Sequence, residues 1–154
     1  MKALTLWQPW GSLIAIGAKP WEFRGWPPPA SLVGAQMAVH AGARPVRVSE
    51  VKDLIYRLAG GGGGGWSTGL IPDLAIPYLE AVLRNPRATL LSHVVCTVRV
   101  GEPVPGWKIA EQLGGHVNDS DREEHSNWAW PMLEVQPLEP PEPRRGGQGL
   151  WNWP

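Results

Sequence analysis

The chain has 154 residues, with 14 basic and 14 acidic side chains and therefore no net charge. This length is typical of one domain, and the absence of net charge argues against a protein that wraps a long duplex, because such proteins neutralise many phosphates. The lone Cys96 excludes an internal disulfide, and no apolar run approaches the ~20 residues that cross a bilayer. We therefore expect a cytoplasmic protein with no membrane partner.

Local patterns in the first sixty residues predict three short strands and two helices. Apolar residues after Pro9 have helical spacing as far as Gly17, which suits a left-handed C-cap. A second apolar stripe predicts the clearest helix in the chain, with Ser49 as its N-cap and Gly60 at its end. The expected elements are strands at 2–7, 19–26 and 34–42, helices at 8–17 and 49–60, and an extended Trp-Pro-Pro-Pro segment at 26–29.

The second part of the chain predicts more strands than helices. The glycine run 60–65 lacks the Lys-Ser/Thr of a phosphate loop, and we interpret it as a flexible surface loop. Pro77 predicts a kink or restart in one helix, and Pro131 predicts that its strand lies at an edge or a bulge. The remaining expected elements are helices at 72–85 and 107–115, strands at 88–104, 128–140 and 150–153, and a polar loop at 116–127.

Many short strands with inserted helices, and neither a βαβ series nor a repeat, predict an α+β fold with a small, mostly antiparallel, barrel-like sheet. One domain over residues 1–154 accommodates this pattern. Eight of the ten tryptophans lie near the two ends of the chain, so we expect one indole-rich region if the ends meet.

Three blocks of the sequence resemble a known family. They are LWQPWGSLIAIGAK with Gly17-x-Lys19-x-x-Glu22-x-Arg24, the stretch AVHAG, and the tail WAWPMLEVQPLEPPEPRRGGQGLW. These residues are similar to the ASCH domain of the PUA-like superfamily. The resemblance implies a PUA-like β-barrel with flanking helices and a helical insertion at about 49–87. It also implies a cleft between the first helix and the sheet, and binding of RNA or another nucleic acid.

The implied cleft is lined by Lys19, Glu22 and Arg24. Lysine suits a phosphate, arginine grips an anion with two donors, and a carboxylate accepts from the exocyclic amine of cytosine. We therefore expect the partner to be RNA or a nucleotide, or else single-stranded DNA, with no cofactor. An ion pair of Glu22 with Lys19 or Arg24 that serves structure alone is the alternative. The ligand-binding candidates are Lys19, Glu22, Arg24, Trp26, His40 and Trp10.

A small hydrolase is the rival function. Some ASCH relatives deacylate acetylated cytidine, which implies a threonine nucleophile three residues after the lysine, where this chain has Glu22. Lys19 and Glu22 are thus the catalytic candidates, either for such an amidohydrolase or, with His40, for cleavage of single-stranded RNA. A third interpretation is a protein-interaction module that uses the helical insertion and the triple-proline segment.

The remaining candidate groups give weaker evidence of a function. The acidic stretch 116–125 lacks the glycine and the spacing of a calcium loop, so we expect solvated charge and no metal. Cys96 falls within a predicted strand and is expected to be inert. Arg44 and Arg47 either extend the basic rim of the cleft or are merely solvated.

Overall fold

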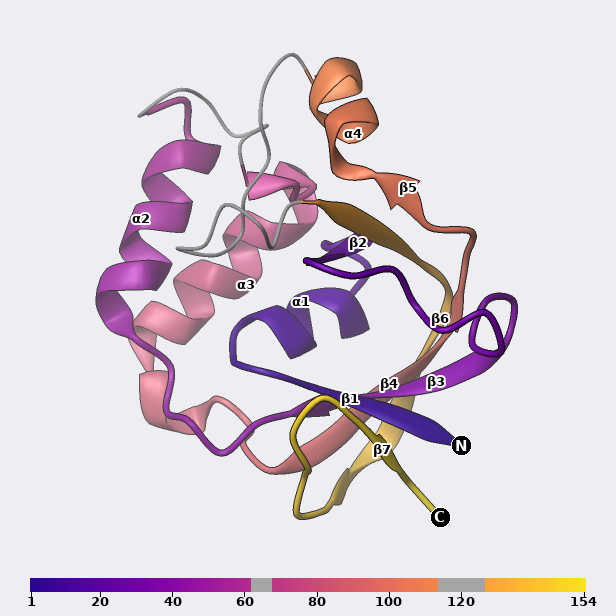
Figure 1. Cartoon of the computed structure of the whole chain (residues 1–154). Helices are drawn as coiled ribbons and strands as arrows, with labels where there is room; N and C mark the ends of the chain where they lie inside the picture. Colours follow the sequence, from indigo (N-terminus) through magenta and orange to yellow (C-terminus); the bar gives the residue numbers. More distant parts are fainter. Residues whose placement is uncertain (62–67, 114–126) are drawn as a thin grey trace.

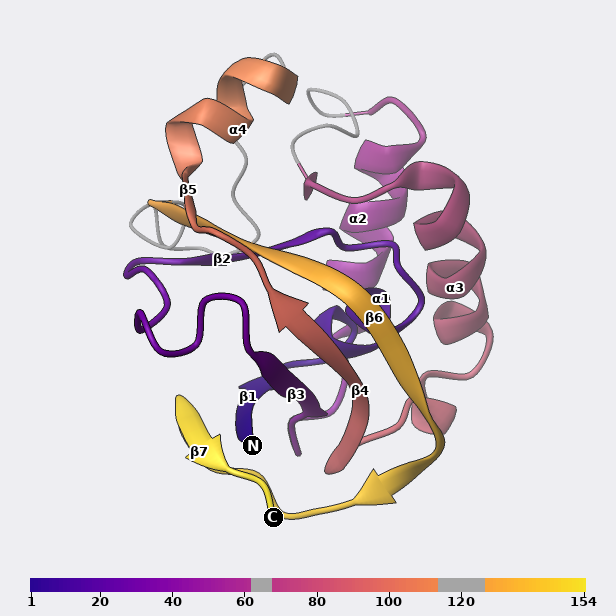
Figure 2. The same ribbon diagram turned by 90° about the vertical axis from the view of Figure 1, so that its right-hand side faces the viewer.

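A computed structural model describes residues 1–61, 68–113 and 127–154, which form a curved sheet with helices packed against it (Figures 1 and 2). The strands are β1 (Lys2–Leu6), β2 (Trp21–Arg24), β3 (Gln36–Ala41), β4 (His93–Val100), β5 (Val104–Pro105), β6 (Trp128–Pro143) and β7 (Leu150–Asn152). The helices are α1 (Trp10–Ala15), α2 (Val48–Leu58), α3 (Pro72–Arg84) and α4 (Gly106–Leu113), with a 3₁₀ turn, η2, at Pro86–Ala88.

The strands follow the order β2-β6-β4-β3-β1-β7, with β5 added to β6. Among the described strands only β1 and β3 run parallel, and every other pair is antiparallel. The predicted α+β fold with a small, mostly antiparallel, barrel-like sheet is confirmed. Because β2 and β7 stand at the two ends of this order, the sheet forms an open half-barrel.

Helix α1 lies between the sheet and the hairpin formed by α2 and α3. Its Ile14 joins the main core, which includes Leu4, Met37 and Trp130 from the inner face of the sheet. The adjacent Leu13 packs instead with residues of α2 and α3, among them Leu54 and Leu79. One short helix therefore ties the α2–α3 hairpin to the sheet, and its position sets the point from which the chain enters β2.

The two ends of the chain meet, as expected. Strand β7 pairs with β1, and the amino group of Met1 donates to the carbonyl of Trp153 at 3.1 Å. The indoles nevertheless form separate groups. Trp130 belongs to the main core, whereas Trp151 and Trp153 pack with Ala38 on the opposite face of the sheet. The expectation of one indole-rich region was wrong, because β6 turns Trp130 to one face of the sheet and the C-terminal segment turns Trp151 and Trp153 to the other.

Two boundary predictions need correction. Helix α2 begins at Val48 with Arg47 at the N-cap, and no side chain caps it, so Ser49 lies inside the first turn. Helix α3 runs unbroken through Pro77. The predicted end of α2 is confirmed, since Gly60 has φ +99°, a conformation that favours glycine.

Strand β6 is an interior strand, although Pro131 led us to expect an edge or a bulge. It lies between β2 and β4, and Pro131 comes one residue before β6 begins to pair with β4, at Met132 opposite Val100, the last residue of β4. A missing N–H is therefore tolerated at this point. A bulge does occur further on, where the register with β4 shifts and Glu134 adopts φ +48°.

Two predicted loops lie mostly outside the described residues, namely the glycine run after Gly61 and the polar stretch 116–127. Within the described ranges, no helix has the length and apolar character needed to cross a membrane.

Candidate functional site

The turn after α1 positions Lys19. Gly17 adopts φ +79°, and its N–H donates to Ile14 O at 2.9 Å. The N–H groups of Ala18 and Lys19 then both donate to Leu13 O, at 2.9 and 3.1 Å. A left-handed glycine followed by paired bonds to one carbonyl is a tight helix C-terminus. It directs the chain straight from α1 into β2.

Strand β2 places Glu22 and Arg24 on one face. They lie opposite Trp130 and Trp128 of β6 in an antiparallel register, and residues two apart along a strand share a face. The intervening Phe23 packs on the other side with Ile109 and Ala129. The local alternation predicted from sequence is thus present in the structure.

The three charged residues come together around one carboxylate. Lys19 Nζ lies 3.6 Å from Glu22 Oε2, and Arg24 Nε donates to Glu22 Oε1 at 3.0 Å. Lys19 and Glu22 are buried, at 1% and 5% exposure, whereas the Arg24 side chain is 25% exposed. The group therefore presents an arginine to solvent and keeps its lysine and carboxylate beneath the surface.

Aromatic rings surround the ammonium group of Lys19. Its Nζ lies 5.2 Å from the ring centres of both Trp10 and Phe23, a distance at which rings attract a cation. Trp10 is itself fixed by a hydrogen bond from its Nε1 to Glu50 Oε1 at 3.1 Å, which joins α1 to α2. Trp10 is therefore a wall of this group and not an exposed stacking surface.

Trp26 is the exposed indole beside the charged group. It is 42% exposed and meets the ring of Trp130 edge-on, with 4.9 Å between centroids. Trp130 Nε1 also donates to the carbonyl of Trp26 at 3.0 Å. A buried tryptophan thus holds a surface tryptophan in place, which makes Trp26 the available π-face on this side of the molecule.

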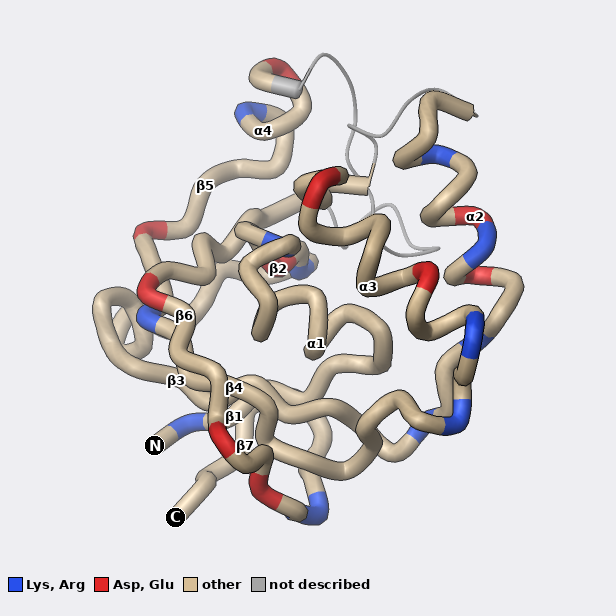
Figure 3. Tube along the Cα trace, turned by 180° about the vertical axis from the view of Figure 1, so that it is seen from behind, with Lys and Arg blue, Asp and Glu red and all other residues tan. Residues whose placement is uncertain are grey.

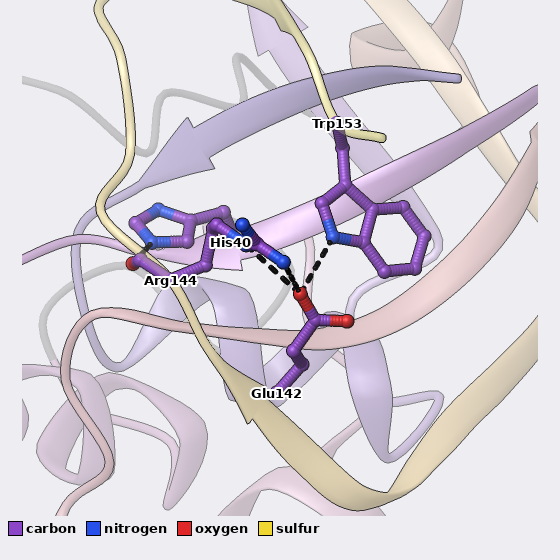
Figure 4. A network of polar contacts seen from close by, with 4 residues as sticks. All are labelled: His40, Glu142, Arg144 and Trp153. Carbon is purple, nitrogen blue, oxygen red and sulfur yellow. Dashed lines mark hydrogen bonds and ion pairs between the residues drawn. The ribbon is translucent and has the colours of Figure 1, made fainter.

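His40 belongs to a different part of the structure. It lies on β3, is 1% exposed, and its Nε2 is 2.8 Å from the carbonyl of Arg144 (Figure 4). A carbonyl only accepts, so Nε2 carries the proton and Nδ1 accepts from the hydroxyl of Thr5 at 3.2 Å. Thr5 in turn accepts from Trp151 Nε1 at 3.0 Å. Every polar atom of the ring is satisfied in the neutral form.

The surroundings of His40 agree with that neutral state. Burial lowers the pKa of His40, the hydrogen bond to Arg144 opposes this effect, and the charge of His93 lowers the pKa further. Of the candidate residues, Lys19, Glu22, Arg24, Trp10 and Trp26 gather around β2, and His40 does not join them. Arg44 is stacked 3.7 Å above the ring of Trp7 and lies 3.5 Å from Glu50, the carboxylate that also holds Trp10.

The remaining candidates from the sequence are Cys96 and the metal-ligating side chains. Cys96 is buried in the core, and burial raises the pKa of its thiol to about 12. No group of three or more His, Cys, Asp or Glu side chains in the described ranges is placed to hold a metal ion. The acidic stretch 116–125 lies outside those ranges.

Sequence reasoning missed a hollow of about 680 Å³. It is lined by Thr5, His40, residues 42–43 and 91–93, and the turn 143–147. The signal in the sequence was the run Arg144-Arg145-Gly146-Gly147, in which paired cations precede paired glycines.

Comparisons with known proteins find a likeness in structure and none in sequence. No family model matches the chain, and no curated protein matches it. A solved structure, that of a point mutant of ZmASCH from Zymomonas mobilis, is similar with a TM-score of 0.49. The two sequences are 16% identical, and the match covers 97% of this chain and 85% of that chain.

Proposed function

We propose that the chain binds nucleic acid, RNA in the first place, and that Lys19, Glu22 and Arg24 recognise one nucleotide. The observation that carries the proposal is their convergence: a carboxylate held at 3.6 Å and 3.0 Å from two cations, next to an exposed indole. A buried ion pair is weak as a source of stability, since apolar residues of similar volume often do as well. We therefore attribute these three charges to recognition of a ligand and not to stability.

Arg24 is the residue that meets the ligand first. Its Nε is bonded to Glu22, which leaves the four N–H donors of the terminal nitrogens. This planar set of donors matches a phosphate or the edge of a base better than the ammonium group of a lysine does. When Arg24 turns to a phosphate, Glu22 gains room to accept from the exocyclic amine of a base, and cytosine offers that amine.

Trp26 supplies the stacking surface. One base stacked on an aromatic ring contributes about 1–3 kcal/mol and is available only when the base is unpaired. The proposed ligand is therefore single-stranded. The absence of net charge on the chain agrees with a short contact on a few phosphates and not with a long duplex.

The test compares Arg24→Ala with Arg99→Ala. Both remove one positive charge, but Arg99 pairs with Glu134 on the surface at 2.9 Å, away from β2. Binding of short cytosine-rich RNA, measured by fluorescence anisotropy at several salt concentrations, should weaken about tenfold in Arg24→Ala. Its logarithmic salt slope should also flatten by about 0.7, the value for one phosphate contact on a single strand.

Equal affinities of Arg24→Ala and Arg99→Ala would refute the proposed site. Uracil-rich RNA serves as the base control, since uracil lacks the exocyclic amine that Glu22 would contact.

The same protein incubated with acetylated cytidine should release no cytidine. Turnover that disappears in Glu22→Gln would replace the binding function by the hydrolase alternative.

A further inference from the structure

A hollow of about 680 Å³ opens at the end of the molecule opposite β2. Three segments surround it: the residues after β3, those that lead into β4, and the turn between β6 and β7. Figures 1 and 2 both place this turn at one end of the sheet and β2 toward the other. Such a volume lies within the range of about 300–1,000 Å³ that small-molecule sites occupy.

The lining of the hollow contains cations and no carboxylate. The cations are Arg144 and Arg145, and the imidazole rings of His40 and His93 also line the hollow. Glu142 is the acidic neighbour, and it is already engaged (Figure 4). Its Oε1 accepts from Arg144 and, at 3.2 Å, from Trp153 Nε1, and these bonds lower the pKa of Glu142 and keep it ionised.

Arg145 is therefore the uncompensated charge at this hollow. Glu142 neutralises Arg144, whereas Arg145 is exposed and forms no ion pair with any residue of the described ranges. An anion placed in the hollow would meet this guanidinium without displacing a carboxylate from it. That absence of competition distinguishes Arg145 from Arg24 and Arg44, which are both paired.

The backbone on both sides of Arg145 is held firmly. His40 Nε2 donates to the carbonyl of Arg144 at 2.8 Å, and the N–H of Arg144 donates to Ser92 O at 2.9 Å. Gly146 packs so closely that a Cβ there would lie 2.4 Å from the ring of His40. A positioned binding group loses less conformational entropy when a ligand arrives.

His93 offers a second contact. Its Nδ1 is 2.7 Å from the carbonyl of Leu91, so Nδ1 carries the proton, and Nε2 of the neutral ring is left as an acceptor for a ligand in the hollow. Ser92 between them adopts φ +55°, which is uncommon for a residue with a side chain. This conformation brings His93 back toward Leu91 and fixes the direction of its ring.

Further cations lie on the segments that lead away from and back to the lining of the hollow. Arg47 precedes α2, Arg84 ends α3, and Arg87 lies in η2, which leads toward β4. All three are exposed, and none pairs with a carboxylate of the described ranges. Figure 3 shows basic segments gathered where α2 begins and α3 ends. A cluster of one sign raises the local concentration of anions and speeds their arrival.

We propose that this hollow binds the phosphate group of a nucleotide-sized molecule. The Arg145 guanidinium donates to the phosphate oxygens, Nε2 of His93 accepts from the hydroxyl of a monoprotonated phosphate, and the rest of the ligand occupies the remaining volume. A phosphate suits these groups because its oxygens accept from a guanidinium, while a protonated phosphate oxygen can donate to the imidazole of another segment. The proposal uses none of the residues of the proposed RNA site, so either can fail alone.

The experiment titrates the whole chain with inorganic phosphate, 5′-AMP and adenosine by isothermal calorimetry. We expect phosphate and 5′-AMP to bind and to compete with each other, and adenosine not to bind. Arg145→Ala should weaken both about tenfold, the loss of one charge-assisted hydrogen bond. His93→Gln should weaken them as well, and thermal unfolding should show that both variants are folded.

Two controls locate the site. Arg99→Ala changes the net charge equally at a remote position, and Arg24→Ala removes the proposed RNA contact, so both should bind 5′-AMP within about twofold of the native protein. Equal affinity in Arg145→Ala and Arg99→Ala, or binding of adenosine as tight as that of 5′-AMP, would overturn the proposal. Competition by RNA with a 5′-phosphate but not a 5′-hydroxyl would identify a nucleic-acid end as the source of the phosphate. Absence of that competition would identify a free nucleotide.

Discussion

Gly146→Ala is a direct test of how the turn 143–147 is held. A Cβ at this position would lie 2.4 Å from Cε1 and 2.6 Å from Nδ1 of His40, and 2.9 Å from Thr5 Oγ1. His40 is buried and bonded at both nitrogens, so its ring has nowhere to move. Overpacking of this kind costs about 1–3 kcal/mol, and losing the bond from His40 to Arg144 adds about 1 kcal/mol.

We therefore expect Gly146→Ala to lower the free energy of unfolding by about 2–4 kcal/mol, a large part of the stability of a small domain. Urea denaturation measures this quantity, and NMR of the His40 ring protons reports the local change. Gly11→Ala is the matched control, because its Cβ would meet nothing closer than 3.6 Å and alanine is favoured in a helix. A free energy of unfolding within about 0.5 kcal/mol of the native value, with unchanged His40 signals, would refute the reasoning.

Two further predictions concern buried groups. The pKa of His40 is lowered in the folded chain, so between that value and the ordinary value of about 6.5 the unfolded chain binds more protons. Stability should therefore fall as the pH drops through this window, and unfolding measured from about pH 8 to 5 should show a shallower dependence in His40→Gln. An identical dependence in the two proteins would contradict the assignment. The pKa of Cys96 is raised to about 12, so its thiol should not react with a disulfide reagent near neutral pH until urea unfolds the chain.

Much of the fold was predictable because it depends on short-range patterns. Alternation indicated β1 and β2, and helical spacing indicated α1 and α2. The left-handed glycines Gly17 and Gly60 correctly marked the ends of two helices. Where the sequence misled us, distant parts of the chain decide the outcome. Pro131 is tolerated in an interior strand only because β4 ends opposite the next residue, a fact that no local pattern contains.

The candidate sites also divide into a part that short-range patterns predict and a part that only the tertiary structure decides. Lys19, Glu22 and Arg24 come together because six residues of a turn and one strand place them, so their proximity could be predicted. His40 was grouped with them on chemistry alone, whereas pairing of β3 with β1 and β4 places it beside Thr5 and Arg144. The hollow depends on residues about a hundred positions apart, and only the tertiary structure assembles it.

Strand β6 joins both ends of the molecule in a single piece of backbone. It faces Glu22 at Trp130 and reaches the hollow at Pro143. At the rise of an extended strand this path measures at most about 44 Å. No mononucleotide bridges such a span, whereas a flexible oligonucleotide does. If one strand of RNA occupies both sites, the affinity of the protein for RNA should rise abruptly once the oligonucleotide is long enough to reach from Glu22 to the hollow. The length of β6 sets this minimum.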